Sequence, residues 1–216
     1  TTATATGTAA LSGLVGSDVV TLSGTPTYSF AQSTVGTGIG ITTAGYTITG
    51  AAAGNYSLTQ PSLSGNITSK ALTITGLTGD NKTYDGTTTA TATGTASLSG
   101  LVGSDAVTLS GTPTYTFAQS TVGTGIGITT AGYTITGTDA GNYILTQPSL
   151  TANITAKELT ITGLTGVNKE YDGTTTATAS GTAVLSGVLG SDVVTVSGTP
   201  SYTFAQSTVG TGIGIT

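Results

Sequence analysis

The most constraining feature of the chain is a stretch that recurs along it at a fixed spacing. Residues 98–137 occur almost unchanged at residues 11–50, where only positions 19 and 29 differ, and the pattern starts a third time at Leu185. Each copy is offset from the previous one by 87 residues, as the equivalent residues Tyr28, Tyr115 and Tyr202 show. A repeat of this length is in the size range of one domain. It is too long for one coil of a solenoid, whose repeats run about 20–45 residues. The period therefore predicts a tandem array in which each repeat has its own core.

The period also predicts where the repeats begin and end. We expect a complete repeat at 70–156, preceded at 1–69 by a repeat that lacks its first strand or strands. The residues 157–216 then form a repeat that lacks its last strands. Thr1 is equivalent to Thr88 and Thr216 to Thr129, so the chain is expected to be a window on a longer array.

Composition excludes several classes of function. The chain has four lysine or arginine residues against nine acidic residues, for a net charge of −5. Nucleic acid is therefore not expected as a partner, because few positive groups are available to neutralise phosphates. No apolar run approaches the roughly 20 residues that a membrane-spanning helix needs. The absence of His and Cys removes the commonest general base and the thiol nucleophile, so we predict that the chain is not an enzyme.

Alternating apolar and polar residues predict short strands throughout the complete repeat. The clearest are 71–75, 87–95, 106–110, 115–117 and 133–136, separated by turn signals rich in Gly, Pro and Asp. No helical period is visible. About seven such strands in a repeat predict an all-β fold, specifically tandem antiparallel immunoglobulin-like β-sandwich domains.

The segment Asp139-Ala-Gly-Asn-Tyr143 supports this fold. A strand that ends in Gly, followed by a tyrosine that opens the next strand, is similar to the tyrosine corner of immunoglobulin-like sandwiches, in which the hydroxyl bonds the backbone across the corner. The first repeat keeps Gly54 and Tyr56 but has Ala52 in place of the aspartate.

Three motifs of the repeat carry a family resemblance. The sequences Lys82-Thr-Tyr-Asp-Gly86 and Lys169-Glu-Tyr-Asp-Gly173 are each followed by T-T-T-A-T, and Gly141-Asn-Tyr143 closes the complete repeat. With the opening L-T-I-T-G-L-T-G, they resemble the YDG repeat domains of bacterial surface proteins. The resemblance covers the whole chain. It implies large secreted, adhesin-like exoproteins in which many such domains form a stalk.

The carboxylates are the first candidates for a chemical site. In the middle repeat, Asp80, Asp85, Asp105 and Asp139 all lie at turn signals, where aspartate has a local structural role. Position 80 is Val167 in the third repeat, so the carboxylate is not a fixed feature of the repeat. Calcium needs six to eight oxygen ligands. A calcium site could form in the repeat only if Asp85 and Asp105 came together in space with backbone carbonyl oxygens.

Other patterns have a structural explanation beside a functional one. Lys82 with Asn142 or Asn153 contains the ingredients of a covalent Lys–Asn crosslink, although a solvated lysine is the simpler interpretation. The glycine-rich segments 36–40 and 123–127 lack the lysine and the helix of a phosphate-binding loop. The Thr-rich run 87–95 is better explained as a strand with small inward residues than as an ice-binding ladder. Three Asn-x-Thr sequons begin at Asn66, Asn81 and Asn153 and matter only in a host that glycosylates them.

From these observations we predict no catalytic, cofactor-binding or metal-ligating residue and no cofactor. The expected function is structural: a rigid extracellular stalk or fibre on a bacterial cell surface, serving adhesion or biofilm formation. Its expected partners are other copies, along or between chains, and a host or neighbouring cell that other domains would contact. One alternative is a self-assembling extracellular filament in which the repeats polymerise or bundle. A carbohydrate-binding module is the third possibility. Such modules present an exposed aromatic platform to the sugar, and this chain has no tryptophan.

Overall fold

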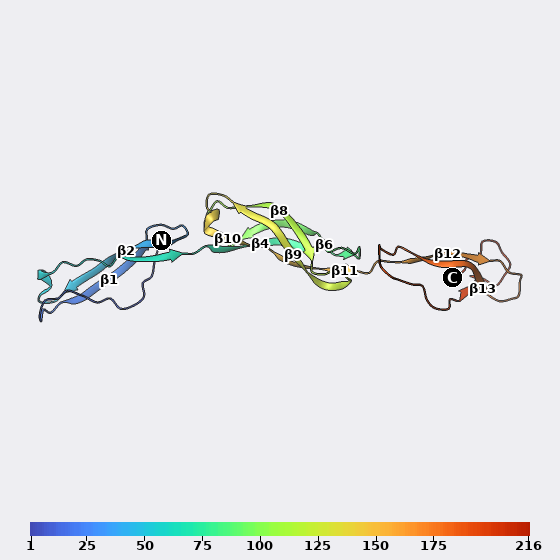
Figure 1. The fold of residues 1–216 in the computed structure, drawn as a ribbon, viewed down its shortest axis with the longest axis horizontal. Helices are drawn as coiled ribbons and strands as arrows, with labels where there is room; N and C mark the ends of the chain where they lie inside the picture. Colours follow the sequence, from blue (N-terminus) through green and yellow to red (C-terminus); the bar gives the residue numbers. More distant parts are fainter. The chain divides into compact units, whose positions relative to one another are not determined.

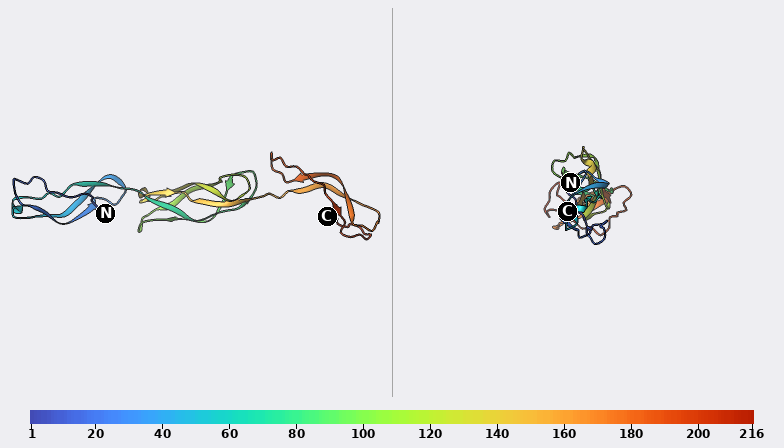
Figure 2. Two further views of the ribbon diagram at one scale, coloured as in Figure 1. Left: turned by 90° about the horizontal axis from the view of Figure 1, so that it is seen from below. Right: turned by 90° about the vertical axis from the view of Figure 1, so that its left-hand side faces the viewer.

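The computed structural model describes every residue from Thr1 to Thr216. Strands dominate, and the helical structure is confined to two short 3-10 turns, η1 (Ala53–Asn55) and η2 (Ala140–Asn142). No helix is long and apolar enough to cross a membrane. Figures 1 and 2 show the strands as twisted arrows joined by loops. The all-β expectation is confirmed.

The strands are short to medium in length and follow one another along the whole chain. In chain order they are β1 (Thr21–Phe30), β2 (Gly36–Thr49), β3 (Leu63–Ile67), β4 (Lys70–Gly79), β5 (Lys82–Thr83), β6 (Thr89–Ala90), β7 (Ala92–Ser99), β8 (Thr108–Phe117), β9 (Gly123–Thr136), β10 (Tyr143–Thr146), β11 (Ser149–Thr155), β12 (Thr160–Val167), β13 (Thr176–Ser186) and β14 (Tyr202–Thr203).

The chain divides into two compact units. The first contains residues 1–76, 95–113 and 132–148, and the second contains 77–94, 114–131 and 149–216. Four strands of the middle repeat (β4, β7, β8 and β9) contribute residues to both units.

In the first unit, one sheet has the order β1-β2-β3 and another the order β10-β4-β7. Strands β1 and β2 form an antiparallel ladder from Thr21↔Thr49 to Phe30↔Ile41, and β3 adds antiparallel to β2. Strand β10 lies parallel to β4, with Tyr143 opposite Lys70 and Thr146 opposite Thr73. Leu72 on β4 is fully buried, in keeping with the alternation of apolar and polar residues along that strand.

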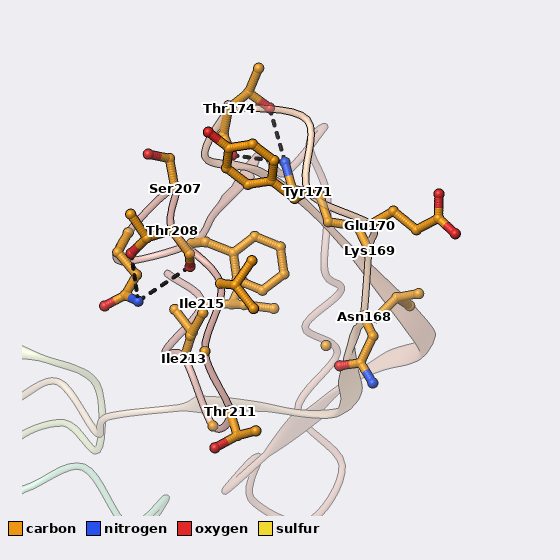
Figure 3. Close-up of a pocket in the computed structure, with 17 residues that line it drawn as sticks. Asn168, Lys169, Glu170, Tyr171, Thr174, Ser207, Thr208, Thr211, Ile213 and Ile215 are labelled. Carbon is orange, nitrogen blue, oxygen red and sulfur yellow. Dashed lines mark hydrogen bonds between the residues drawn. The ribbon is translucent and has the colours of Figure 1, made fainter.

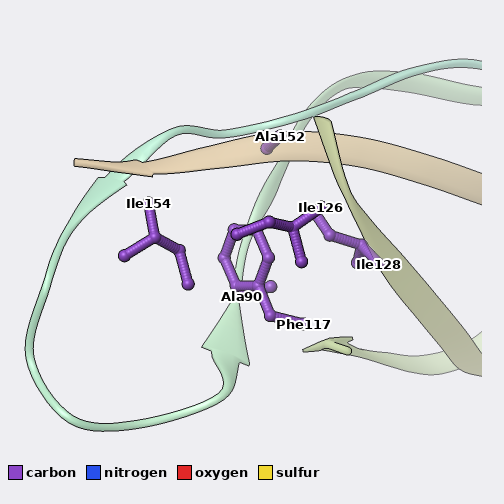
Figure 4. Packing of buried hydrophobic residues seen from close by; sticks show 6 residues of the cluster. All are labelled: Ala90, Phe117, Ile126, Ile128, Ala152 and Ile154. Carbon is purple, nitrogen blue, oxygen red and sulfur yellow. The ribbon is translucent and has the colours of Figure 1, made fainter. Parts of the chain in front are cut away.

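The second unit contains the sheet β5-β11-β9-β8-β6 and the sheet β12-β13-β14. The first of these sheets carries a buried apolar cluster (Figure 4), in which Phe117 and Ile154 are almost completely buried. The other members are Ala90, Ile126, Ile128 and Ala152. Ala90 belongs to the Thr-rich run, and its burial confirms that this run turns small residues inward.

Two expected strand breaks lie inside continuous strands, and the equivalent pair β1–β2 has a bulge at this place, between Gly24 and Thr27. Strand β8 runs through Pro113, and β9 runs from the glycine-rich segment to Thr136. Gly111 and Gly132 face each other there with φ of 100° and 95°, and a Cβ on Gly111 would lie 2.1 Å from the Gly132 carbonyl oxygen. Glycine tolerates this positive φ, and without a Cβ it leaves room for the two backbones to come close together. The expectation of separate short strands was therefore wrong for this pair.

The expectation of a purely antiparallel arrangement was also wrong. Besides β10–β4, the pair β11–β5 is parallel, with Ile154 opposite Lys82 and Thr155 opposite Thr83. Alternation along a strand reports which face is buried but not the direction of its neighbour, so the sequence pattern could not reveal these pairs. What the structure supports is an all-β fold of several small, partly mixed sheets.

Candidate functional site

The K-x-Y-D-G motif forms a compact polar cluster around the Lys82 ammonium group. Its Nζ donates to Asp85 Oδ1 at 2.7 Å, to the Thr87 carbonyl oxygen at 2.7 Å, to Thr87 Oγ1 at 3.1 Å and to the Thr89 carbonyl oxygen at 3.0 Å. The same nitrogen lies 5.6 Å from the centre of the Phe117 ring, within range of a cation–π interaction. Only 17% of the Lys82 side chain is exposed. The lysine therefore ties the loop 85–89 to the edge of the apolar core.

Asp85 is the second half of this cluster. Its Oδ1 also accepts hydrogen bonds from the Thr87 backbone N–H and hydroxyl, both at 2.9 Å. The following Gly86 has a φ of 78°, which is the left-handed conformation that glycine adopts readily. The Lys82 ammonium and the two Thr87 donors lower the pKa of Asp85 to about 2. The turn expected at Asp-Gly is confirmed, and its carboxylate is bound on one oxygen by three donor groups.

The third repeat builds the same cluster from equivalent residues. Lys169 Nζ donates to Asp172 Oδ1 at 2.8 Å and to the Thr174 carbonyl oxygen at 2.9 Å. It lies 5.8 Å from the centre of the Phe204 ring, and the pKa of Asp172 is likewise lowered to about 2, chiefly by Lys169. The motif therefore encodes a local structure that recurs with the period.

A second recurrent feature joins the G-N-Y motif to the loop before β8. The Tyr143 hydroxyl donates to Asp105 Oδ2 at 2.6 Å and accepts from the Val102 backbone N–H at 3.0 Å. Tyr56 makes the same two bonds with Asp18 and Val15, at 2.6 and 2.9 Å. The bond to the aspartate is the main cause of the raised pKa of each tyrosine.

This arrangement corrects the tyrosine-corner expectation. The hydroxyl does bond the backbone, but its partner lies 41 residues upstream, whereas the partner in a tyrosine corner lies only a few residues upstream. Asp139, which opens the motif, accepts from the Ala106 N–H at 2.8 Å. The tyrosine thus closes a long loop, and we call this pair of bonds the tyrosine staple.

The candidate acids do not come together as a chemical site. Asp80 accepts from the hydroxyls of Thr91 and Thr93. Asp85 is held by Lys82, Asp105 accepts from the Tyr143 hydroxyl, and Asp139 accepts from the Ala106 N–H. Asp85 and Asp105 belong to different units. No group of three or more acidic side chains is placed to hold a metal ion. Each of these carboxylates has a structural partner.

The asparagines of the candidate crosslink are also engaged. Asn153 Oδ1 accepts from the Gly125 N–H at 2.8 Å, and its backbone N–H donates to Asn81 Oδ1 at 2.7 Å. Asn142 belongs to the other unit from Lys82. The bonds of the Lys82 ammonium described above include neither asparagine. Two sequon asparagines, Asn81 and Asn153, therefore use their side chains to hold β11 in place.

The glycine-rich segments have the same structural role. Asn66 Oδ1 accepts from the Gly38 N–H at 2.9 Å, which repeats the Asn153–Gly125 bond in the first repeat. Their backbone N–H groups thus bind asparagine side chains across a bulge.

Two structural residues escaped the sequence analysis. Gln147 pairs with the backbone of Tyr133, donating from Nε2 to its carbonyl oxygen at 2.8 Å and accepting at Oε1 from its N–H at 3.2 Å. Gln60 does the same at Tyr46. The only signal in the sequence was the recurrence of Gln-Pro at the period of the repeat.

Comparison with known proteins identifies one family. A family model described as "YDG domain" matches residues 1–63, 68–152 and 155–216. No curated protein and no solved structure matches the chain.

Proposed function

Because the chain belongs to the YDG domain family, built here from near-identical repeats, we propose that it is a structural repeat region of a secreted bacterial cell-surface protein. In this proposal many repeats form a rigid extracellular stalk or fibre that serves adhesion or biofilm formation. The chain carries no reaction of its own, and binding to a host or a neighbouring cell belongs to other domains.

The single observation that carries the proposal is that the side chains of the recurring motifs make structural hydrogen bonds within the fold. The lysine, aspartate and tyrosine side chains that recur with the period bind the backbone or each other. The lysine cluster recurs at Lys169 and the tyrosine staple at Tyr56. The recurring residues therefore stabilise the fold of each repeat and do not form a cleft of unsatisfied polar groups. This is what we expect of a protein segment that acts as a spacer.

We also retain the immunoglobulin-like sandwich as a proposal for the complete repeat. Its apolar positions alternate along β4, β9 and β11 as they do in strands that cover a core on one face. The parallel pairs described above would make it an unusual member of that class.

The alternative of a self-assembling filament is favoured by one specific observation. Valines are exposed at equivalent turns and loops of the first two repeats: Val15 is 70% exposed and Val102 51%, and Val35 is 36% exposed and Val122 53%. Apolar side chains at regular positions along an array would give neighbouring chains a repeated contact.

Imaging the purified 216-residue chain and longer arrays of the same repeat tests the choice. Isolated rods in negative-stain micrographs, with a rod-like small-angle scattering profile, support the stalk, whereas lateral bundles support the filament. A scattering profile of a flexible coil contradicts both. Labelling of intact source cells with an antibody against the repeat tests the surface location, and signal only after lysis contradicts it.

A further inference from the structure

The complete repeat is connected to its neighbours directly through its first and last strands. Strand β4 begins at Lys70, and only residues 68 and 69 separate it from β3 of the preceding repeat. The last strand, β11, ends at Thr155, and β12 of the following repeat begins at Thr160. Because so few residues give little slack, a pull along the array reaches β4 at its N-terminal end and β11 at its C-terminal end.

The two parallel pairs of the repeat join its first strands to its last ones. In the first unit, β4 pairs with β10. In the second unit, β5 pairs with β11, with Lys82 opposite Ile154. Each pair therefore joins the segment 70–83, which we call the opening segment, to the segment 143–155, which we call the closing segment.

The pair β5–β11 is joined by several hydrogen bonds within a few residues. The Asn153 N–H donates to Asn81 Oδ1 at 2.7 Å, and the Tyr84 N–H donates to the Thr155 carbonyl oxygen at 2.8 Å. The Thr155 hydroxyl donates to the Lys82 carbonyl oxygen at 3.3 Å. These bonds fasten the end of the closing segment to the end of the opening segment.

Apolar packing and a close backbone approach accompany these pairs. Leu72 of β4 is fully buried, and Ile154 of β11 is 1% exposed. Within the second unit, a Cβ on Gly79 would lie 2.8 Å from the Thr151 carbonyl oxygen of β11, so the two backbones are close there as well. The buried side chains limit the access of water to the hydrogen bonds, which slows their replacement by bonds to water.

The parallel direction of the pairs decides how tension acts on them. In each pair, the opening strand is pulled from its N-terminal end and the closing strand from its C-terminal end. In a parallel pair these two ends lie at opposite ends of the ladder. The force therefore acts along the strands, and the bonds of the ladder share it. If the two strands were antiparallel, the pulled ends would lie side by side and the bonds would open one at a time.

We propose that the parallel pairs β4–β10 and β5–β11 form a shear clamp, by which each repeat keeps its fold when the array is under tension. The clamp rests on the proposed function, because tension reaches it only in a stalk or fibre that is pulled at its ends. It adds to that function a direction in which the repeat is strong.

The residues of the clamp recur with the period. Residues 66–68 of the first repeat have the same sequence, Asn-Ile-Thr, as residues 153–155. Residues 168–171 of the third repeat are equivalent to 81–84 and keep the asparagine, the lysine and the tyrosine (Figure 3). Both halves of the clamp are therefore part of the repeated sequence.

Pulling the middle repeat in two directions tests the clamp. The chain has no cysteine, so two introduced cysteines define where optical tweezers apply force to the full 216-residue chain. Lys70→Cys with Glu158→Cys gives tension along the array, whereas Thr83→Cys with Glu158→Cys pulls on the neighbouring C-terminal ends of β5 and β11. All three residues are exposed. We expect the first pair to require at least about twofold more force, because the bonds of a parallel ladder then share the load.

A change of one side chain tests the bonds of the clamp. Asn81→Ala removes the acceptor of the Asn153 N–H, and under a fixed load along the array it should speed unfolding about fivefold. The matched control is Thr93→Ala, which removes a hydrogen bond to Asp80 that does not join the opening and closing segments. It should leave the unfolding rate under that load unchanged.

The outcomes separate the clamp from the stalk. Equal unfolding forces in the two directions, or equal unfolding rates of Asn81→Ala and the wild type, would overturn the clamp and leave the array as a rigid spacer. Smooth extension of the repeat in both directions, with no discrete unfolding event, would overturn both the clamp and the stalk.

Discussion

Replacing Lys82 with methionine tests whether the K-x-Y-D-G motif is a structural cluster. Methionine keeps an unbranched apolar stem over Phe117 but removes the ammonium group, so the change isolates the bonds made by Nζ. The ion pair itself contributes little, because half of the Asp85 side chain is exposed. The larger loss concerns the carbonyl oxygens of Thr87 and Thr89, which lose a charged donor. Hydrogen bonds to charged groups contribute about 1.5–3 kcal/mol. Both threonines are exposed and water can replace part of the loss, so we expect a destabilisation of about 2 kcal/mol.

Hydrogen exchange of the full chain is the assay, because it reports on this part of the molecule separately from the other repeats. A loss of about 2 kcal/mol corresponds to roughly thirtyfold faster exchange of the protected amides around 84–92. The matched control is Lys70→Met, since Lys70 is an exposed lysine with no ion pair in the structure. Equal exchange in the two variants would refute the structural account of the motif.

Three further changes probe the core, the bulge and the charged turn. Phe117→Ala should cost about 3–5 kcal/mol, seen as a lower midpoint in urea followed by circular dichroism, and a midpoint within error of wild type would contradict the packing. Gly111→Ala should destabilise by more than about 1 kcal/mol, because its Cβ meets a backbone oxygen; Gly127→Ala, with nothing within 4 Å, is the control in the same thermal melts and should differ little from wild type. Asp85 has its pKa lowered to about 2, below its unfolded value of about 3.9. Its contribution is therefore present above about pH 4 and lost as the pH falls through about 2, so Asp85→Asn should flatten the stability curve between about pH 5 and pH 2, and an unchanged slope would count against the pair.

Local chemistry allowed much of the fold to be predicted. The Asp85-Gly86 turn follows from properties of two neighbouring residues, and the burial of Ala90 follows from alternation along one strand. The period predicted that equivalent residues would make equivalent bonds, as the lysine clusters at Lys82 and Lys169 do.

The remainder depends on residues far apart in the sequence. Strand β10 lies parallel to β4, and the Tyr143 hydroxyl accepts a hydrogen bond from the Val102 N–H. Both features depend on which distant segments come together in the folded chain. A tyrosine after Gly-Asn is expected to have a hydrogen-bond partner for its hydroxyl, but the sequence does not identify that partner. The same holds for Lys82, whose sequence suggested a solvated surface residue and whose amine instead binds two backbone carbonyls.

The central claim is that the repeats are mechanical units, and stretching single molecules tests it most directly. We expect discrete unfolding events in a tandem array of the 70–156 repeat, with extension steps of at most about 30 nm, from 87 residues at up to ~3.6 Å each. Lys82→Met in every repeat should lower the unfolding force. A smooth extension without discrete events, as a flexible coil gives, would contradict the account.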